Sequence, residues 1–445
     1  MLYERLRDLE KNHQPIRVGI IGAGTFATQI ISQTCRMVGM RISAVADLKK
    51  ERAARALDLG GIPAERVLFA DTPEGINEAI ERGRPAVTAS ADALIGSRVD
   101  VVIEATGLVE AAAQHGYRAL QAKKHLVMVT VEADVLVGYL LKQLADEHGV
   151  IYSLAYGDEP ALAYELWDWA KTLGFHVVAA GKGTRFLPAF RKANPDDVPR
   201  MYGFSGKEYN AQMFGSFLDG TKHAIEMAVL SNATGLVPDV RGMHIPAADL
   251  REMPDTLSLK SKGGILDTEG VVEAISSARP DGSPVERSIR GGLFAVVAAP
   301  DGPAIESLAS YGEITGMIVG QRSKQAMIYR PQHFVGHEVP YGIARMMVYK
   351  TSIGAPIGRI SEVVAAAKKT LKAGTILDGE GGYTVYGLIE KTSIARDQSL
   401  VPIGLTQGAE VIRDIPEDGM ITYADVRLPD SFALRLRKQQ DSRAG

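Results

Sequence analysis

The chain has 445 residues, of which 46% are hydrophobic and 23% are charged, and its formal net charge is −3. The length predicts two or three domains, and the composition is that of a globular protein. Without an excess of basic residues, the chain has no electrostatic basis for binding nucleic acid or an anionic membrane surface. Its single cysteine, Cys35, excludes an intramolecular disulfide, and the apolar run around it predicts a buried, unreactive thiol.

No segment of the sequence predicts export or membrane insertion. Residues 1–15 are charged and amphipathic and lack the apolar core of a secretory signal. No run of about 18 apolar residues occurs, so no transmembrane helix is expected. We therefore expect a cytoplasmic protein that acts on a small molecule and has no membrane or nucleic-acid partner.

Residues 1–157 alternate between helical and extended patterns. After an amphipathic helix at 1–12, continuous apolar runs typical of strands buried on both faces alternate with stretches of helical spacing. The alternation predicts an α/β domain built on a Rossmann-type, doubly wound parallel sheet. The expected strands are 16–22, 41–47, 99–107, 124–130 and 149–155, and the expected helices are 25–38, 49–58, 73–83, 109–122 and 134–148.

The pattern changes near residue 158 and again near residue 351. The middle region mixes both patterns and predicts an α+β catalytic and dimerisation domain, with strands at 176–183, 293–300 and 317–330 and helices at 209–231 and 341–350. Further on, segments 363–378 and 408–426 share apolar alternation, a glycine and an apolar finish, as short repeated β-hairpin units do. We therefore expect domains at 1–157 and 158–350 and a small β-rich module at 351–445.

The most informative short motif follows the first strand. Gly22, Gly24 and Ala27 fit the pattern G-x-G-x-x-A, and Thr25 and Phe26 open the following helix. The first glycine permits a tight turn, the second lets the backbone approach a pyrophosphate, and the small third residue allows close helix–strand packing. The free N–H groups at the helix start favour an anion. These residues predict a dinucleotide site, and the alternative is a chance glycine turn in another α/β fold.

The residue at the end of the second strand bears on which dinucleotide is bound. Asp47 is placed to accept hydrogen bonds from ribose hydroxyls and to repel a 2′-phosphate, which favours NAD over NADP. Lys49, Lys50 and Arg52 follow at once, and they either hold a phosphate or form a solvated helix start. Thr106 and Gly107 end the third long strand, whose edge lies beside the cofactor in this kind of sheet.

Two adjacent carboxylates, Asp158 and Glu159, follow a buried strand and open a helix ahead of Pro160. Oxygen ligands of this kind suit a hard cation such as Mg²⁺ or Mn²⁺. The alternatives are binding of substrate hydroxyls and capping of the helix.

Four residues farther along are candidates for catalysis. Lys182 lies between two glycines after a strand and suits binding of a carbonyl, carboxylate or phosphate. Asp219, Lys222 and Glu226 fall on a predicted helix, where Lys222 and Glu226 share a face. They form either a proton-transfer cluster or an ordinary helical ion pair. His244, in a polar loop with a glycine, is a candidate ligand-binding residue.

The basic residues of segment 184–206 have two readings. Arg185, Arg191, Lys192 and Arg200 either hold a phosphate or carboxylate or belong to a solvated loop, and the sequence does not decide between them.

The order of several motifs resembles the deoxyxylulose-phosphate reductoisomerase-like (DRL) enzymes. These enzymes are relatives of homoserine dehydrogenase that carry a C-terminal SAF-type module. The likeness covers nearly the whole chain and rests on GIIGAGTFAT, VIEATG, KHLVMVTVEADV, GVIYSLAYGDEPA, AGKG, DGTKHAIEMA, NATGLVPDVRGMHIPAA, KGGIL and VPIGLTQGAEVIRDIP.

The resemblance implies a homo-oligomer and a reaction that joins hydride transfer to skeletal rearrangement with the aid of a divalent metal. Asp158 and Glu159 would bind the metal or the substrate, and Lys182, Asp219 and Lys222 would hold substrate oxygens. One departure matters, because NADPH-using members would be expected to carry basic residues where Asp47 stands. The acid favours NAD and the oxidative direction.

Three interpretations follow. The first is an NAD(P)-dependent oxidoreductase, in its fullest form an oxidoisomerase, acting on a small polyhydroxylated or phosphorylated substrate. The second is a simple dehydrogenase of the homoserine or sugar-acid type, without rearrangement or metal. The third is a dinucleotide-binding protein without catalytic activity.

Overall fold

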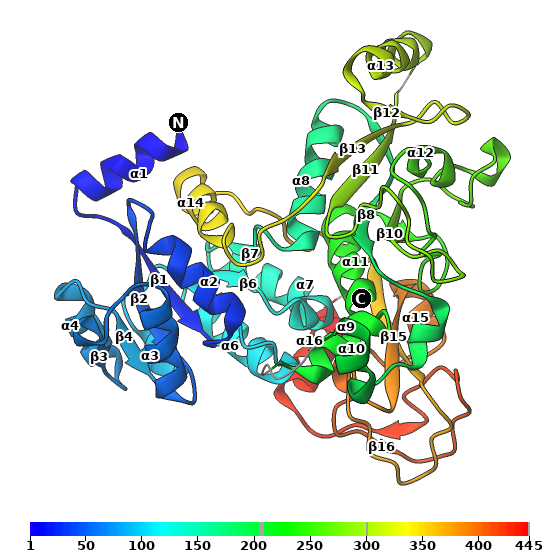
Figure 1. The fold of residues 1–445 in the computed structure, drawn as a ribbon. Coiled ribbons are helices and arrows are strands. Elements are labelled where there is room, and N and C mark those ends of the chain that lie inside the picture. Colours follow the sequence, from blue (N-terminus) through cyan, green and yellow to red (C-terminus); the bar gives the residue numbers. More distant parts are fainter. Residues whose placement is uncertain (204–208, 300, 444–445) are drawn as a thin grey trace. The chain divides into compact units, whose positions relative to one another are not determined.

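The computed structural model describes residues 1–203, 209–299 and 301–443 (Figure 1). The chain forms two compact units. The first contains Met1–Ala161, Phe334–Ala355 and Ser431–Gly445, and the second contains Leu162–His333 and Pro356–Asp430. No helix in the described ranges has the length and hydrophobicity that a membrane span requires. The predicted boundaries at 157/158 and 350/351 stay predictions.

The first unit is built on a seven-stranded sheet with the order β3-β4-β2-β1-β5-β6-β7. Every strand pair in this sheet is parallel, so the predicted Rossmann-type sheet is confirmed. Strands β2, β3 and β4 lie on one side of β1, and β5, β6 and β7 lie on the other. Sheets of this kind bind their ligands at the point between β1 and β5 where the strand order changes sides. The strands are β1 Ile16–Ile21, β2 Met40–Ala46, β3 Leu68–Phe69, β4 Ala86–Thr88, β5 Val101–Glu104, β6 His125–Met128 and β7 Tyr152–Leu154.

Helices cover both faces of the sheet, as buried parallel strands require. They are α1 Leu2–Lys11, α2 Thr25–Thr34, α3 Lys50–Leu59, α4 Pro73–Glu81, α5 Ala91–Gly96, α6 Val109–Gln121 and α7 Val131–Glu147, with α14 Val339–Tyr349 and α16 Phe432–Arg443 from later in the chain. Helix α16 was not predicted. It packs on α6 and α7, and the Gln440 amide bonds the backbone of Leu136 and Leu140.

The prediction of a buried Cys35 is wrong. The predicted helix 25–38 ends at Thr34, and Cys35 is its exposed C-terminal cap. The apolar run suggested a longer helix, but the chain turns at Gly39, with φ +70°, to enter β2.

The second unit contains a six-stranded mixed sheet with the order β12-β13-β11-β8-β10-β9. Its central strand β8, His176–Thr184, runs parallel to β10 and antiparallel to β11. The predicted strand 317–330 is two short strands, because Asp255 accepts the backbone N–H groups of a turn at residues 321–323. The other strands are β9 Val237–Pro238, β10 Val271–Ser276, β11 Leu293–Ala298, β12 Ile318–Val319 and β13 Ala326–Arg330.

The predicted helix 209–231 is also divided. It forms α10 (Ala211–Leu218) and α11 (Thr221–Thr234), separated by Asp219 and Gly220. Gly220 has φ +87°, and the Asp219 carboxylate accepts the N–H of Thr221, so these two residues end one helix and start the next. Helix α11 contacts β8 and β10 and also β14 and β15, and Lys222 is its one residue that is not fully buried.

The C-terminal segment is β-rich, as predicted. Strands β14 (Ser361–Ala367) and β15 (Val385–Lys391) form one antiparallel pair, and β16 (Glu410–Val411) and β17 (Val426–Arg427) form another. The two repeat segments bond to each other, since Leu371 and Ile415 exchange backbone hydrogen bonds of 2.9 and 2.8 Å. The remaining helices are α8 Glu159–Thr172, α9 Val198–Tyr202, α12 Met253–Thr256, α13 Gly302–Thr315 and α15 Thr392–Asp397.

Candidate functional site

The glycine turn after β1 has the geometry that a pyrophosphate site needs. Gly22 has φ +97°, and a Cβ there would lie 2.6 Å from the carbonyl oxygen of Ala105, so a side chain does not fit. Gly24 caps α2, and no atom lies within 4 Å of the position of its missing Cβ. Ala27 is fully buried, whereas Thr25 is exposed at the helix start. The turn therefore presents open backbone and the first N–H groups of α2 to an anion.

Asp47 is tied to this turn. One carboxylate oxygen accepts the N–H of Ala23 at 3.0 Å, and the other accepts the N–H of Lys49 at 2.9 Å. Each carboxylate oxygen has a second lone pair, so the group retains acceptor capacity for ribose hydroxyls. Lys50 forms an ion pair with Asp71, so it is engaged away from Asp47.

A buried carboxylate that the sequence analysis did not single out organises the sheet edge near Thr106 and Gly107. Glu104 ends β5 with no exposed surface, and it accepts the Thr106 hydroxyl at 2.6 Å. Its other oxygen accepts the hydroxyl of Thr130, which in turn accepts the N–H of Gly107 at 3.1 Å. These bonds connect the loops after β5 and β6. The feature of the sequence that could have identified Glu104 is its position as an acid at the end of an otherwise apolar strand.

Asp158 and Glu159 lie where helix α8 begins. An Asp158 oxygen accepts the backbone N–H of Glu159 at 3.0 Å, which is a helix-starting contact. In the described part of the chain, no group of three or more His, Cys, Asp or Glu side chains is placed to hold a metal ion. Because Mg²⁺ is commonly bound through one or two carboxylates, with water or substrate at its other positions, a metal role for this pair stays a prediction.

Lys182 and Glu226 form a buried ion pair in the second unit. Each side chain is 2% exposed, and the ammonium nitrogen also lies 5.7 Å from the centre of the Phe217 ring. Lys182 comes from β8 and Glu226 from α11, so the packing of this helix on the sheet brings them together. Glu226 therefore pairs across the fold, while Lys222, which is partly exposed, lies one turn earlier on the helix.

His223 lies near Lys182, and the sequence analysis did not single it out. Its Nε2 lies 2.7 Å from the hydroxyl oxygen of Thr184, at the end of β8. Burial, and then the positive charges of Lys182 and Arg191, hold the pKa of His223 well below its usual value. This lowered pKa disfavours the protonated imidazole. The feature of the sequence that could have identified His223 is its position beside Lys222 in the DGTKH motif.

Asp219 lies in a different environment from the one expected. It is fully buried, its Oδ2 lies 2.7 Å from Nζ of Lys368, and its Oδ1 accepts the N–H of Thr221 at 2.8 Å. Lys368 also donates to the carbonyl oxygens of Ala193 and Gly382. These contacts join three segments of the second unit, and they favour a structural role for Asp219 over contact with a substrate.

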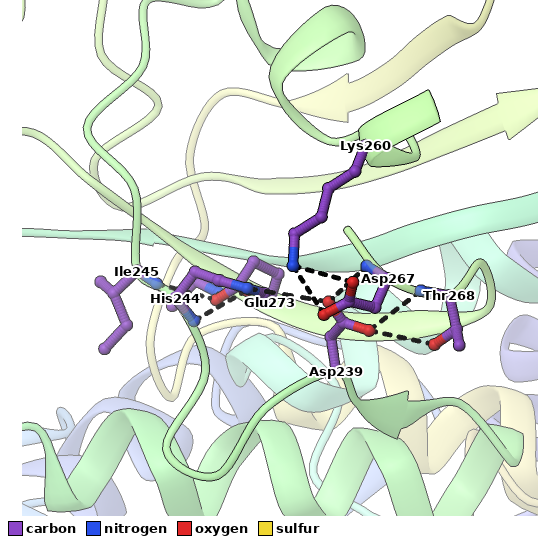
Figure 2. A network of polar contacts seen from close by, with 8 residues as sticks. Asp239, His244, Ile245, Lys260, Asp267, Thr268 and Glu273 are labelled. Atoms are coloured by element: carbon purple, nitrogen blue, oxygen red, sulfur yellow. Dashed lines mark hydrogen bonds and ion pairs between the residues drawn. The ribbon is translucent and has the colours of Figure 1, made fainter. Parts of the chain in front are cut away.

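His244 belongs to a polar network around Glu273, which Figure 2 shows from close by. The buried Glu273 carboxylate accepts the backbone N–H groups of His244 and Ile245 and lies 3.0 Å from Nδ1 of the imidazole. Asp239 Oδ2 lies 3.7 Å from the other ring nitrogen. Ile245 has φ +48°, a strained conformation for a β-branched residue. The hydrogen bonds to Glu273 therefore hold the loop in a backbone conformation that is unfavourable by itself.

Together, a dinucleotide-type glycine turn and a separate sheet with a buried lysine–glutamate pair define an NAD(P)-binding oxidoreductase. Matches to family models agree. Residues 18–154 match the NAD-binding domain of homoserine dehydrogenase, and residues 157–339 match the catalytic domain of oxidoreductase DRL. The chain is therefore an enzyme that joins a homoserine dehydrogenase-type NAD-binding domain to a DRL catalytic domain, as the resemblance predicted. The interpretation as a non-catalytic binding protein is set aside. No SAF-type module was matched.

A comparison with solved structures gave matches of low sequence identity. Scyllo-inositol dehydrogenase from Lactobacillus casei is 13% identical, with a TM-score of 0.38 over 77% of this chain and 92% of that one. UDP-N-acetylglucosamine 3-dehydrogenase from Acidithiobacillus ferrooxidans is 12% identical, with a TM-score of 0.41 over the same shares. A 3-ketoreductase from Actinomadura kijaniata is 19% identical, with a TM-score of 0.27, and the match spans 50% of its length and 39% of this chain. A search of curated sequences gave no match.

Proposed function

We propose that this enzyme oxidises a small polyhydroxylated or phosphorylated substrate with NAD, using Lys182 and Glu226 at the reacting oxygen. The observation that carries the proposal is the buried ion pair between these two side chains, with the neutral His223 and Thr184 beside it. An ammonium group out of water interacts more strongly with a developing negative charge than it would at the surface.

Oxidation of an alcohol removes a hydride from carbon and a proton from oxygen, and the bound dinucleotide supplies the hydride acceptor. In the proposal, the Lys182 ammonium donates a hydrogen bond to the substrate oxygen and stabilises it as the proton leaves. Glu226 pairs with Lys182 and orients it, and the Glu226 carboxylate takes the proton. Reversal of these steps protonates the oxygen when a carbonyl is reduced.

The choice of NAD rests on Asp47. Its carboxylate lies at the end of β2, fixed by Ala23 and Lys49, where a negative charge repels a 2′-phosphate. Exposed Lys49 and Arg52 are the residues that would favour NADP instead.

Oxidation coupled to skeletal rearrangement is the second candidate, and it is favoured by the match to the DRL catalytic domain over residues 157–339. The first candidate is oxidation without rearrangement. The two differ in the carbon skeleton of the product.

The experiment is an absorbance screen at about 340 nm, the nicotinamide band, with sugar acids, tetronates and deoxyxylulose phosphate, each cofactor, and metal present or chelated. Once a substrate is found, Lys182→Met should lower kcat by roughly 10²–10⁴-fold while NADH binding, followed by fluorescence, stays unchanged. Lys171→Met, at an exposed position of α8, is the control and should keep full activity. Unchanged turnover in Lys182→Met would overturn the site, and product analysis by NMR separates plain oxidation from rearrangement.

A further inference from the structure

The basic residues of segment 184–203 have very different surroundings. Lys192 is paired with Asp418 and lies 3.0 Å from Glu417, and Arg200 lies 2.9 Å from Asp197. Arg185 is exposed beside the Phe190 ring. Residues 204–206, the end of the predicted basic segment, lie outside the described residues. Arg191 is the member of this set that is partly buried without a carboxylate partner among the described residues.

Arg191 is held by aromatic rings in place of an acid. Its guanidinium carbon lies 5.0 Å from the centre of the Phe186 ring and 5.7 Å from the centre of the Tyr386 ring. The backbone of Gly242 closes another side, since a Cβ there would lie 3.4 Å from a guanidinium nitrogen. Ring faces stabilise the cation and fix its plane, but they do not accept hydrogen bonds in the guanidinium plane, so its N–H groups stay available to a ligand.

The two carboxylates that act most on the charge of Arg191 are each paired with a lysine. Asp219 and Asp418 both act on Arg191 through charge, yet Asp219 is paired with Lys368 and Asp418 with Lys192. Burial lowers the pKa of Arg191, which shows that the cation is partly removed from water. A partly desolvated cation without a paired anion is costly, so a bound anion would relieve it.

Arg191 belongs to the neighbourhood of the proposed catalytic groups. Burial is the main cause of the lowered pKa of His223, and the charges of Lys182 and Arg191 add to it. Phe186, on which it stacks, would contact a Cβ at Gly220 at 3.0 Å, at the start of the helix that carries His223 and Glu226. Lys182 is paired with Glu226, whereas Arg191 has no carboxylate partner among the described residues.

We infer that Arg191 is the anion-binding residue of the substrate site and holds an oxyanion group, a carboxylate or a phosphate monoester, through the fork of its guanidinium. The inference rests on the proposed function for the identity of the site, but binding of an anion is measurable without turnover. A planar fork matches both oxyanions with two parallel hydrogen bonds, which a lysine does not reproduce.

The test measures thermal stability of the full chain with NAD while inorganic phosphate or glycolate is titrated. We expect saturable stabilisation of the wild type and of Arg200→Met, the control in the same segment, and none in Arg191→Met. Protection by phosphate alone indicates a phosphorylated substrate, and protection by glycolate alone indicates a sugar acid. Arg191→Lys, which keeps the charge, should bind roughly 10-fold more weakly than the wild type. If Arg191→Met does not fold, the weaker binding by Arg191→Lys tests the inference in its place.

Once a substrate is known, Arg191→Met should raise KM roughly 10- to 100-fold with a smaller change in kcat, and added guanidinium should restore part of the loss. A purely structural role for Arg191 would give neither the KM effect nor the rescue. The inference is overturned if the wild type is not protected by either anion, or if Arg191→Met is protected equally well. Failure of the redox screen, with anion binding intact, would count against the proposed function alone.

Discussion

Asp47 closes the glycine turn from the neighbouring strand, since its Oδ2 accepts the N–H of Ala23 at 3.0 Å. A side chain that is itself a candidate for ribose binding therefore also shapes the loop that receives the pyrophosphate. Asp47→Ala should raise KM for NAD roughly 10- to 100-fold, because hydrogen bonds to a charged group are lost. It should also reduce the preference over NADP.

The matched control is Asp58→Ala, which removes an exposed aspartate of α3. Steady-state kinetics with both cofactors check the prediction. An unchanged ratio of kcat/KM for NAD and NADP in Asp47→Ala would show that Lys49 or Arg52 decides the preference instead.

The two glycines of the turn should respond differently to alanine. Gly24 has φ −78° and open space at its Cβ position, so Gly24→Ala should fold with the stability of the wild type. The added methyl would occupy the space that the pyrophosphate needs, and we expect NADH affinity to fall by at least about 10-fold. In Gly22→Ala, a Cβ would stand 2.6 Å from the Ala105 oxygen at a positive φ, so thermal stability should fall as well. Calorimetry and fluorescence titration separate the two effects.

Asp134 should make the first unit less stable as the pH rises. Its carboxyl is fully buried on α7, bonded to the Tyr152 hydroxyl, and burial raises its pKa from 3.8 to about 7. Because the folded-state pKa is the higher one, the stabilisation is complete below about pH 4 and is lost as the pH rises through about 7. The difference corresponds to roughly 4 kcal/mol of unfolding free energy.

Asp134→Asn, which stays neutral, should therefore be more stable than the wild type at about pH 8 and nearly equal at about pH 4. Urea unfolding at both values measures this. Tyr152→Phe is the companion variant, and it should be destabilised because it removes a hydrogen bond to the Asp134 carboxyl. A wild type whose stability is flat from about pH 5 to about pH 8, with Asn no better, would contradict the assignment.

His244 should give a second pH dependence, in the second unit. Its hydrogen bond with Glu273 raises its pKa above 6.5, with Asp239 adding to the effect and Lys260 opposing it. The protonated form therefore stabilises the fold at low pH, and this stabilisation is lost as the pH rises through the folded-state pKa. His244→Gln should have a flatter dependence of unfolding free energy on pH, with a loss of about 1 kcal/mol at low pH.

His176→Gln is the control. His176 also pairs with a carboxylate, that of Glu269, but the His176 side chain is 52% exposed. NMR titration of the imidazole signals assigns the pKa directly. A pKa for His244 at or below the ordinary value would show that Glu273 does not stabilise the protonated imidazole.

Much of the first unit could be predicted from the sequence. The buried strands, the helix starts and the glycine turn follow from periodicity and from backbone conformation, which depend on residues close together in the chain. The same local rules failed where a single residue breaks a pattern. Asp219 and Gly220 divide a helix that the apolar spacing extended from 209 to 231, and Cys35 lies just beyond a helix end.

The candidate site was predictable only in part. Lys182 and Glu226 were identified singly, but their pairing joins β8 to α11 across 44 residues, and the expected partner of Glu226 was Lys222. Glu104 and His223 were not singled out, because a buried acid and a buried imidazole look ordinary until their neighbours are known.

By itself, the sequence determined the class of sheet, the cofactor turn and the acid at the end of β2, because each depends on short-range spacing and backbone geometry. The tertiary structure decided what each charged side chain contacts. It paired Asp219 with Lys368 and Lys192 with Asp418, and it left Arg191 between two rings without a paired acid among the described residues. The physical reason is that the partner of a charged group is set by which elements pack together, and such contacts join residues far apart in the chain.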